Sequence, residues 1–228
     1  ESDLTVMRLG PEKFLMVTGS AQAVHDADWI NRNIPEGANA VLTDVTSAYA
    51  VLALMGPNAR AILSRITSAD LSNAGFPFAT VREIDVGYAT AYANRMTYVG
   101  ELGWELIVPS EFAVGVYEAL QEAGRDLGLV DCGYYALEGL RLEKGYRAWS
   151  RELTPDITPF EAGLGFAVAM DKPGGFIGRE VLDGAKGKPL AKRIVQFTLD
   201  DGGPMLWGGE LVLRDGRPVG EVRSAAYG

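Results

Sequence analysis

Residues 97–108 read Thr97-Tyr98-Val99-Gly100-Glu101-Leu102-Gly103-Trp104-Glu105-Leu106-Ile107-Val108, which places an aromatic ring and two carboxylates around a glycine-rich bend. The apolar runs on either side are typical of strands, and the two glycines permit a turn that other residues resist. Side chains alternate between the two faces of a strand, so Glu105 points away from the face that carries Trp104. If that second face is covered, an ionised Glu105 needs hydrogen-bond donors, and a heterocycle with adjacent N–H groups supplies them. We therefore interpret this stretch as a ligand site.

The same pattern also fits an ordinary hairpin in which Glu101 and Glu105 are solvated. Charged side chains are mostly exposed in folded proteins, so the pattern alone does not separate the two interpretations. The choice depends on the rest of the chain.

The composition favours a globular protein with a small-molecule ligand. With 228 residues and 47% hydrophobic content, the chain can bury a sizeable core in one or more compact units. The net charge of -9 and a pI near 4.7 disfavour a nucleic acid or an anionic membrane as partner. No apolar run approaches membrane-spanning length, and the first residues lack the basic and apolar regions of a signal peptide.

The sequence argues against a metal centre. The only cysteine, Cys132, excludes an internal disulfide and a zinc site built from paired thiolates, which fits a reducing compartment. The only histidine, His25, excludes a multi-histidine site, and we expect it to be a surface or capping residue of a helix. We therefore predict no bound metal.

The order of the elements predicts an α+β fold. Residues 51–127 follow the pattern strand, helix, three strands, helix, with strands at 50–55, 81–86, 90–98 and 104–108 and helices at 59–66 and 110–127. This pattern is typical of a split βαβ sandwich, in which an antiparallel sheet carries two helices on one face. Elsewhere we predict helices at 21–33 and 135–144, a polar linker at 183–189, and strands at 4–9, 14–17, 40–44, 129–132, 164–170, 194–199, 210–214 and 219–222.

Both ends of the chain suggest a piece of a longer polypeptide. The sequence starts without Met at the edge of a predicted strand, and its last predicted strand has no partner after it. The Gly-rich stretch 163–168 lacks the third small residue of a dinucleotide fingerprint, and the chain has neither a phosphate-binding loop nor a nucleophile elbow.

Several strings together resemble the aminomethyltransferase (glycine-cleavage T-protein) family of folate-binding domains. The chain is most similar to the C-terminal region of dimethylglycine and sarcosine dehydrogenases or oxidases. The resemblance covers essentially the whole chain, and the strings Gly-Glu-Leu-Gly-Trp-Glu and Leu-Arg-Leu-Glu-Lys-Gly are specific when found together. The matching stretches are residues 1–6, 54–60, 98–105, 140–146, 158–164 and 176–180.

The resemblance implies a multi-unit cloverleaf around a hole that holds tetrahydrofolate. Residues 1–50 and 145–185 would form a first α/β unit that lacks its N-terminal part, residues 51–144 a ferredoxin-like unit, and residues 186–228 an incomplete small β-barrel. It implies that Glu105 binds the parallel N–H donors of the pterin and that Tyr98 packs beside the pterin or its linker. Asp3 matches a catalytic aspartate near the reactive folate nitrogens, where it accepts a proton or stabilises a developing cation.

Arg141, together with Lys144 and Arg147, is the candidate for holding the folate glutamate tail, with a plain structural role as the alternative. One departure bears on the activity. The T-protein pattern has an arginine where this chain has Leu137, and the dehydrogenase group commonly has an apolar residue there.

The implied activity is transfer of a one-carbon unit from an N-methyl amine of the dimethylglycine or sarcosine type to give 5,10-methylenetetrahydrofolate. In that group a flavin dehydrogenase domain upstream, with FAD, makes the iminium. The alternatives are a stand-alone aminomethyltransferase, a demethylase on the same fold, and a non-catalytic folate-binding or assembly module. Relatives of the last kind carry a cysteine after Lys-Gly, where this chain has Tyr146. We expect a cytoplasmic protein, or a mitochondrial matrix protein if the source is eukaryotic.

Overall fold

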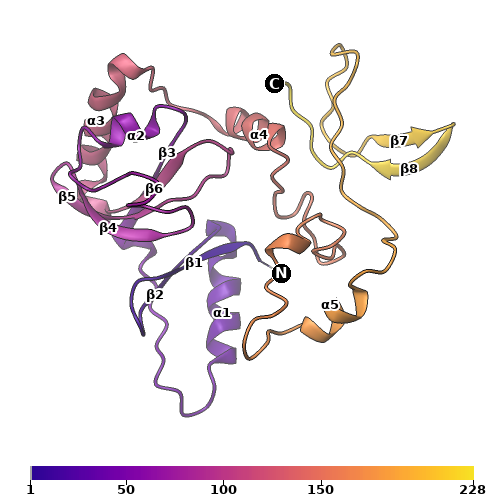
Figure 1. The fold of residues 1–228 in the computed structure, drawn as a ribbon, viewed down its shortest axis with the longest axis horizontal. Coiled ribbons are helices and arrows are strands. Elements are labelled where there is room, and N and C mark those ends of the chain that lie inside the picture. The colour runs from indigo at the N-terminus through magenta and orange to yellow at the C-terminus, as the bar shows by residue number, and fades with distance from the viewer. Residues whose placement is uncertain (1) are drawn as a thin grey trace. The chain divides into compact units, whose positions relative to one another are not determined.

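A computed structural model describes residues 2–228, so Glu1, the first residue of the matching strings, lies outside the described residues. The chain forms two compact units, residues 2–137 and residues 138–228 (Figure 1). The division into three units inferred from the resemblance stays a prediction. Among the described residues, no helix has the length and apolar character that crossing a membrane requires.

A four-stranded antiparallel sheet is the centre of the unit formed by residues 2–137. Its strands pair in the order β3-β6-β5-β4. The predicted strands agree with this sheet, although the strand predicted to reach residue 98 ends at Asn94. The amide of Met96 bonds back to the carbonyl of Asn94, which turns the chain out of the sheet. The strands are β3 (Tyr49–Met55), β4 (Val81–Val86), β5 (Ala89–Asn94) and β6 (Gly103–Pro109).

Two helices cover one face of this sheet, α2 (Ala59–Leu63) and α3 (Ala113–Gly124) (Figure 1). Trp104, Leu106 and Val108 of β6 are completely buried between the sheet and these helices. The core also contains Ile62 and Leu63 from α2, Val116 and Leu120 from α3, and Phe76 from the loop between α2 and β4. An antiparallel sheet with two helices on one face is the arrangement that the apolar pattern predicts.

Gly103, at the start of β6, lies where no side chain fits. A Cβ atom at this position would stand 2.6 Å from the carbonyl oxygen of Leu54 and 3.0 Å from the Cα of Met55, both backbone atoms of β3. The glycine therefore allows β6 to approach β3 closely at the end of the sheet where the loop 95–102 returns.

A hairpin lies on the other face of the sheet. Strands β1 (Leu4–Arg8) and β2 (Phe14–Thr18) pair antiparallel, and the helix α1 (Ala23–Asn33) follows them. The Nζ of Lys13, in the turn of the hairpin, lies 3.5 Å from the hydroxyl of Tyr92 on β5. Met7 of β1 is buried. The sheet is therefore covered on both faces near this hairpin.

The second unit, residues 138–228, has less regular structure. The helix α4 (Tyr134–Glu143) leads into it, and α5 (Arg179–Ala185), β7 (Leu211–Arg214) and β8 (Arg217–Glu221) follow. The strands β7 and β8 form an open antiparallel pair with a register shift between Val212 and Leu213. Short 3-10 turns complete both units at Ser20–Gln22, Thr46–Ala48, Ser110–Phe112, Arg125–Leu127 and Gly165–Ala167.

Four predicted strands are wrong, and local hydrogen bonds account for two of them. After Gly128 (φ +75°), the amide of Leu129 bonds to the carbonyl of Gly124 and closes the end of α3, so residues 129–132 form no strand. Residues 164–170 contain only a 3-10 turn. Neither residues 40–44 nor residues 194–199 form a strand. The polar stretch predicted as a linker instead overlaps the helix α5.

Candidate functional site

Glu105 lies in the middle of the sheet face that is opposite the helices. On β6 it is flanked by Ala53 of β3 and by Asn94 of β5. Its two chain neighbours, Trp104 and Leu106, are completely buried in the core, so the carboxylate of Glu105 points to the other face. The side chain is partly buried there.

Asn94 holds this carboxylate. The amide group of Asn94, whose side chain is only 2% exposed, donates a hydrogen bond from Nδ2 to Oε2 of Glu105 at 3.1 Å. Its other contact is weak, with the thioether sulfur of Met96 at 3.9 Å. Among the described residues, no donor bonds to Oε1 of Glu105. Glu105 is therefore not the freely solvated residue of an ordinary hairpin, because the side chain is partly buried and Asn94 anchors one of its oxygens.

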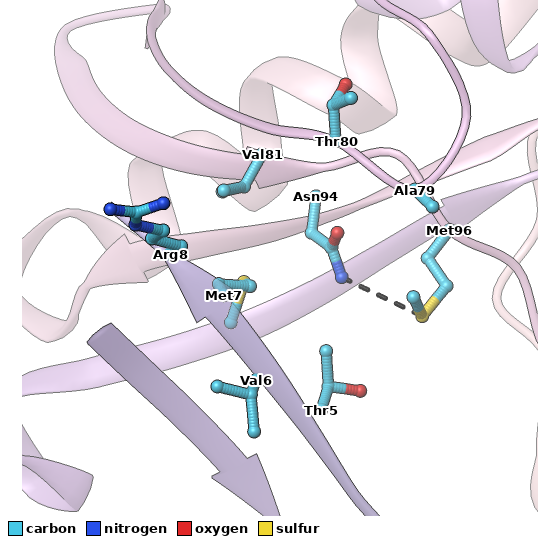
Figure 2. Close-up of a pocket in the computed structure, with 9 residues that line it drawn as sticks. All are labelled: Thr5, Val6, Met7, Arg8, Ala79, Thr80, Val81, Asn94 and Met96. Carbon is cyan, nitrogen blue, oxygen red and sulfur yellow. Dashed lines mark hydrogen bonds between the residues drawn. The ribbon is translucent and has the colours of Figure 1, made fainter. Parts of the chain in front are cut away.

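A cavity of about 450 Å³ lies on the same face of the sheet (Figure 2). Figure 2 shows the side chains of Asn94 and Met96 on the sheet side of this cavity and those of Thr5 and Met7 on the β1 side. A volume of this size is within the range of small-molecule sites. The residues that line it are Thr5, Val6, Met7, Arg8, Ala79, Thr80, Val81, Asn94 and Met96.

The loop 95–102 carries Tyr98 and is fixed to the end of β3. The amide of Gly56 donates to the carbonyl of Leu102 at 2.8 Å, and the hydroxyl of Thr97 contacts the sulfur of Met55 at 3.7 Å. Gly100 has φ +73°, which only glycine adopts easily. The partly buried Tyr98 thus belongs to the same loop and strand as Glu105, as the sequence predicts.

Asp3 lies just before β1 and is exposed. Its neighbour Ser2 is fixed, because the Ser2 hydroxyl donates to Oδ2 of Asp26 on α1 at 2.8 Å. Thr18 donates to the same oxygen at 2.5 Å, and Nδ1 of His25 lies 3.0 Å from Oδ1. The hydrogen bond from Thr18, then that from His25, holds the pKa of Asp26 below its ordinary value. This cluster therefore ties the segment that carries Asp3 to the rest of its unit.

Arg141 lies on α4 in the other unit and is completely buried. Its Nη2 lies 2.5 Å from Glu138, and its Nη1 lies 3.1 Å from the buried carboxylate of Glu152. The guanidinium also donates to the carbonyl of Tyr146 and to the hydroxyl of Ser224, each at 2.9 Å. All three of its nitrogens are engaged, which favours the structural role over the predicted contact with a folate tail. The ligand role of Arg141 stays untested.

Sequence reasoning missed Asn94 and Asp26. Asn94 is the last residue of a strand of small side chains, and its importance depends on its register opposite Glu105, which no local pattern shows. Asp26 has a weak signal, since an acidic residue suits the first turn of a helix.

Two family models match the chain. Residues 1–172 match the GCVT N-terminal domain, and residues 192–228 match the glycine cleavage T-protein C-terminal barrel domain. The first match spans more than half of the chain. The chain therefore belongs to the glycine-cleavage T-protein, or aminomethyltransferase, family, and the resemblance found in its sequence is confirmed.

Sequence similarity to individual proteins is consistent with this family. The human mitochondrial dimethylglycine dehydrogenase is 39% identical over 99% of this chain and 26% of its own length. The 4-methylaminobutanoate oxidase (formaldehyde-forming) of Paenarthrobacter nicotinovorans is 41% identical over 100% of this chain and 28% of its own length. The chain thus spans about a quarter of the length of these curated relatives.

A solved structure supports the fold class. The crystal structure of the glycine cleavage system aminomethyltransferase T from Bartonella henselae matches with a TM-score of 0.81 and 26% identity. The match covers 100% of this chain and 60% of that one. It confirms the predicted α+β fold class, although the sheets of the described residues are open rather than closed into a barrel.

Replacing Asp26 tests the cluster beside Asp3. Because the folded-state pKa of Asp26 is lowered, its carboxylate stabilises the fold above the ordinary pKa of about 4, and this stabilisation is lost as the pH falls through the lowered value. We expect Asp26→Asn to be less stable than the wild type at pH 7, with a difference that shrinks below pH 4. Chemical unfolding at several pH values measures it. The matched control is Asp28→Asn, an exposed residue of the same helix, and an equal effect of both changes would contradict the assignment.

Replacing Arg141 separates its structural role from a ligand role. Arg141→Leu leaves the carboxylate of Glu152 buried without its cation, so we expect a loss of about 3–5 kcal/mol in the free energy of unfolding. Arg179→Leu is the matched control, because Arg179 forms an exposed pair with Asp183 in the same unit and contributes about 0.5 kcal/mol or less. Unchanged stability of Arg141→Leu with weakened tetrahydrofolate binding would instead assign Arg141 to the ligand.

Proposed function

We propose that the chain is a tetrahydrofolate-binding, one-carbon transfer domain in which Glu105 binds the N–H donors of the pterin. The observation that carries the proposal is the state of Glu105, a partly buried carboxylate whose Oε2 is held by Asn94 and whose Oε1 receives no hydrogen bond from the described residues. A partly buried charge needs donors, and this unit supplies one. Each carboxylate oxygen can accept two hydrogen bonds, so Glu105 can also accept the two parallel N–H groups of a heterocycle, one at each oxygen, while its bond to Asn94 is kept.

The chemical roles follow from what each group can do. A carboxylate that accepts two parallel N–H bonds forms a charge-assisted and geometrically selective pair. Glu105 therefore orients the bound molecule, and the ring of Tyr98 packs beside it. When bound, tetrahydrofolate supplies the nitrogen nucleophiles that take up the one-carbon unit and give 5,10-methylenetetrahydrofolate.

Asp3 is the proposed catalytic residue. Its carboxylate takes the proton released at the reacting nitrogen or stabilises the positive charge that develops there. The Ser2–Asp26 hydrogen bond supports this role because it fixes the residue next to Asp3. Continued by one residue, the alternation of β1 gives Asp3 the same parity as Thr5 and Met7, the residues of β1 that are more buried than their neighbours.

The one-carbon donor is proposed to be an iminium made from an N-methyl amine. The names of the relatives support this, since they include dimethylglycine dehydrogenase and 4-methylaminobutanoate oxidase (formaldehyde-forming). Those proteins are about four times as long as the matched region, and we propose that a flavin dehydrogenase domain with FAD makes the iminium in the intact protein. This chain then serves as the part that captures the carbon. Its proposed location is the cytoplasm, or the mitochondrial matrix in a eukaryote.

Glu105→Gln tests the pterin contact. The amide keeps the size of the side chain but removes the charge, and hydrogen bonds to charged groups contribute about 1.5–3 kcal/mol. We therefore expect tetrahydrofolate affinity to fall between about 10-fold and about 100-fold, measured by anaerobic titration calorimetry.

The matched control is Glu101→Gln, which makes the same change in the loop that precedes β6. We expect it to bind tetrahydrofolate like the wild type. Equal affinities of Glu105→Gln and the wild type would show that the carboxylate of Glu105 is not the pterin contact.

A further inference from the structure

We propose that Asn94 is a positioning residue that sets the orientation of the Glu105 carboxylate for its ligand. The inference rests on the proposed function, because it concerns how the same site presents its acceptor oxygens. Asn94 lies opposite Glu105 in the register of β5 and β6, so the two side chains share one face of the sheet.

The burial of Asn94 indicates a specific use of its amide. A buried amide without a hydrogen bond is costly, and Asn94 is 2% exposed. Its Nδ2 donates to Glu105 at 3.1 Å, while its contact with the sulfur of Met96 at 3.9 Å is long and weak. The bond to Glu105 is therefore the main compensation for burying this donor.

Only one of the two cross-strand neighbours of Glu105 carries a side-chain hydrogen-bond donor. On the other flank of Glu105, the partner in the register is Ala53, which has no donor. Asn94 thus holds Oε2 on the side of β5, and no described residue donates to Oε1. A carboxylate that is held in this way before binding loses less rotamer freedom when a ligand arrives.

Two substitutions of Asn94 separate the effect of its hydrogen-bond donor from the effect of its shape. Asn94→Leu keeps nearly the same shape and removes the donor. Asn94→Gln keeps the donor on a side chain that is longer by one methylene, and the cavity of about 450 Å³ that Asn94 lines has room for it (Figure 2). A purely structural role would depend on shape, whereas a positioning role depends on the donor.

The test is the affinity of the full chain for tetrahydrofolate in these variants. We expect Asn94→Leu to weaken binding by about 10-fold and Asn94→Gln to recover most of the affinity. In the Glu105→Gln background we expect Asn94→Leu to cause no further loss of affinity, because Asn94 acts on binding only through the carboxylate of Glu105. Thermal unfolding by circular dichroism checks that each variant is folded, and Asn94→Ala replaces the leucine variant if that one does not fold.

The control is Tyr92→Phe, which changes the next residue of β5 on the same face and is expected to bind like the wild type. Wild-type affinity in both donor-free variants, Asn94→Leu and Asn94→Ala, together with weak binding by Glu105→Gln, would overturn the role of Asn94 and leave the proposed function standing. An equal loss from Asn94→Leu in both backgrounds would also overturn it. Absence of tetrahydrofolate binding by the wild type would overturn the proposed function together with the inference.

Discussion

The complete burial of Trp104 and Leu106 is the constraint on which the candidate site depends. Successive side chains of a strand point to opposite faces, so burying these two residues under α2 and α3 fixes Glu105 on the opposite face. A slip of one residue in the register would drive the carboxylate into the apolar core, which is prohibitive. The pairing of β6 with β3 on one side and β5 on the other then decides that Glu105 has alanine on one flank and an amide donor on the other.

The sequence predicts the sheet well where the apolar pattern is local. The runs around residues 50–55, 81–86 and 104–108 became β3, β4 and β6, and the alternation correctly separates Glu105 from Trp104. It does not reveal Asn94, because a partnership across two strands depends on register. The strand predicted at 129–132 fails for a similar reason. Its residues are apolar enough for a strand, but the amide of Leu129 caps α3.

Arg141, in the second unit, is another residue whose contacts the local sequence pattern does not reveal. The sequence predicts a helix at residues 135–144, and the helix is present. It does not reveal that the guanidinium is buried between Glu138 on its own helix and Glu152 in the loop that follows. Burying an ion pair costs desolvation free energy, and every nitrogen of this arginine has an acceptor to offset that cost. This hydrogen-bond network stabilises the irregular segment after α4, which contains little regular secondary structure.

A structure of the chain with bound tetrahydrofolate would show whether Glu105, oriented by Asn94, is the pterin acceptor. We expect two pterin nitrogens within hydrogen-bond distance of the Glu105 carboxylate, with the bond between Asn94 and Oε2 retained. A pterin ring bound elsewhere, with Glu105 contacting only Asn94, would show that Glu105 is not the pterin acceptor.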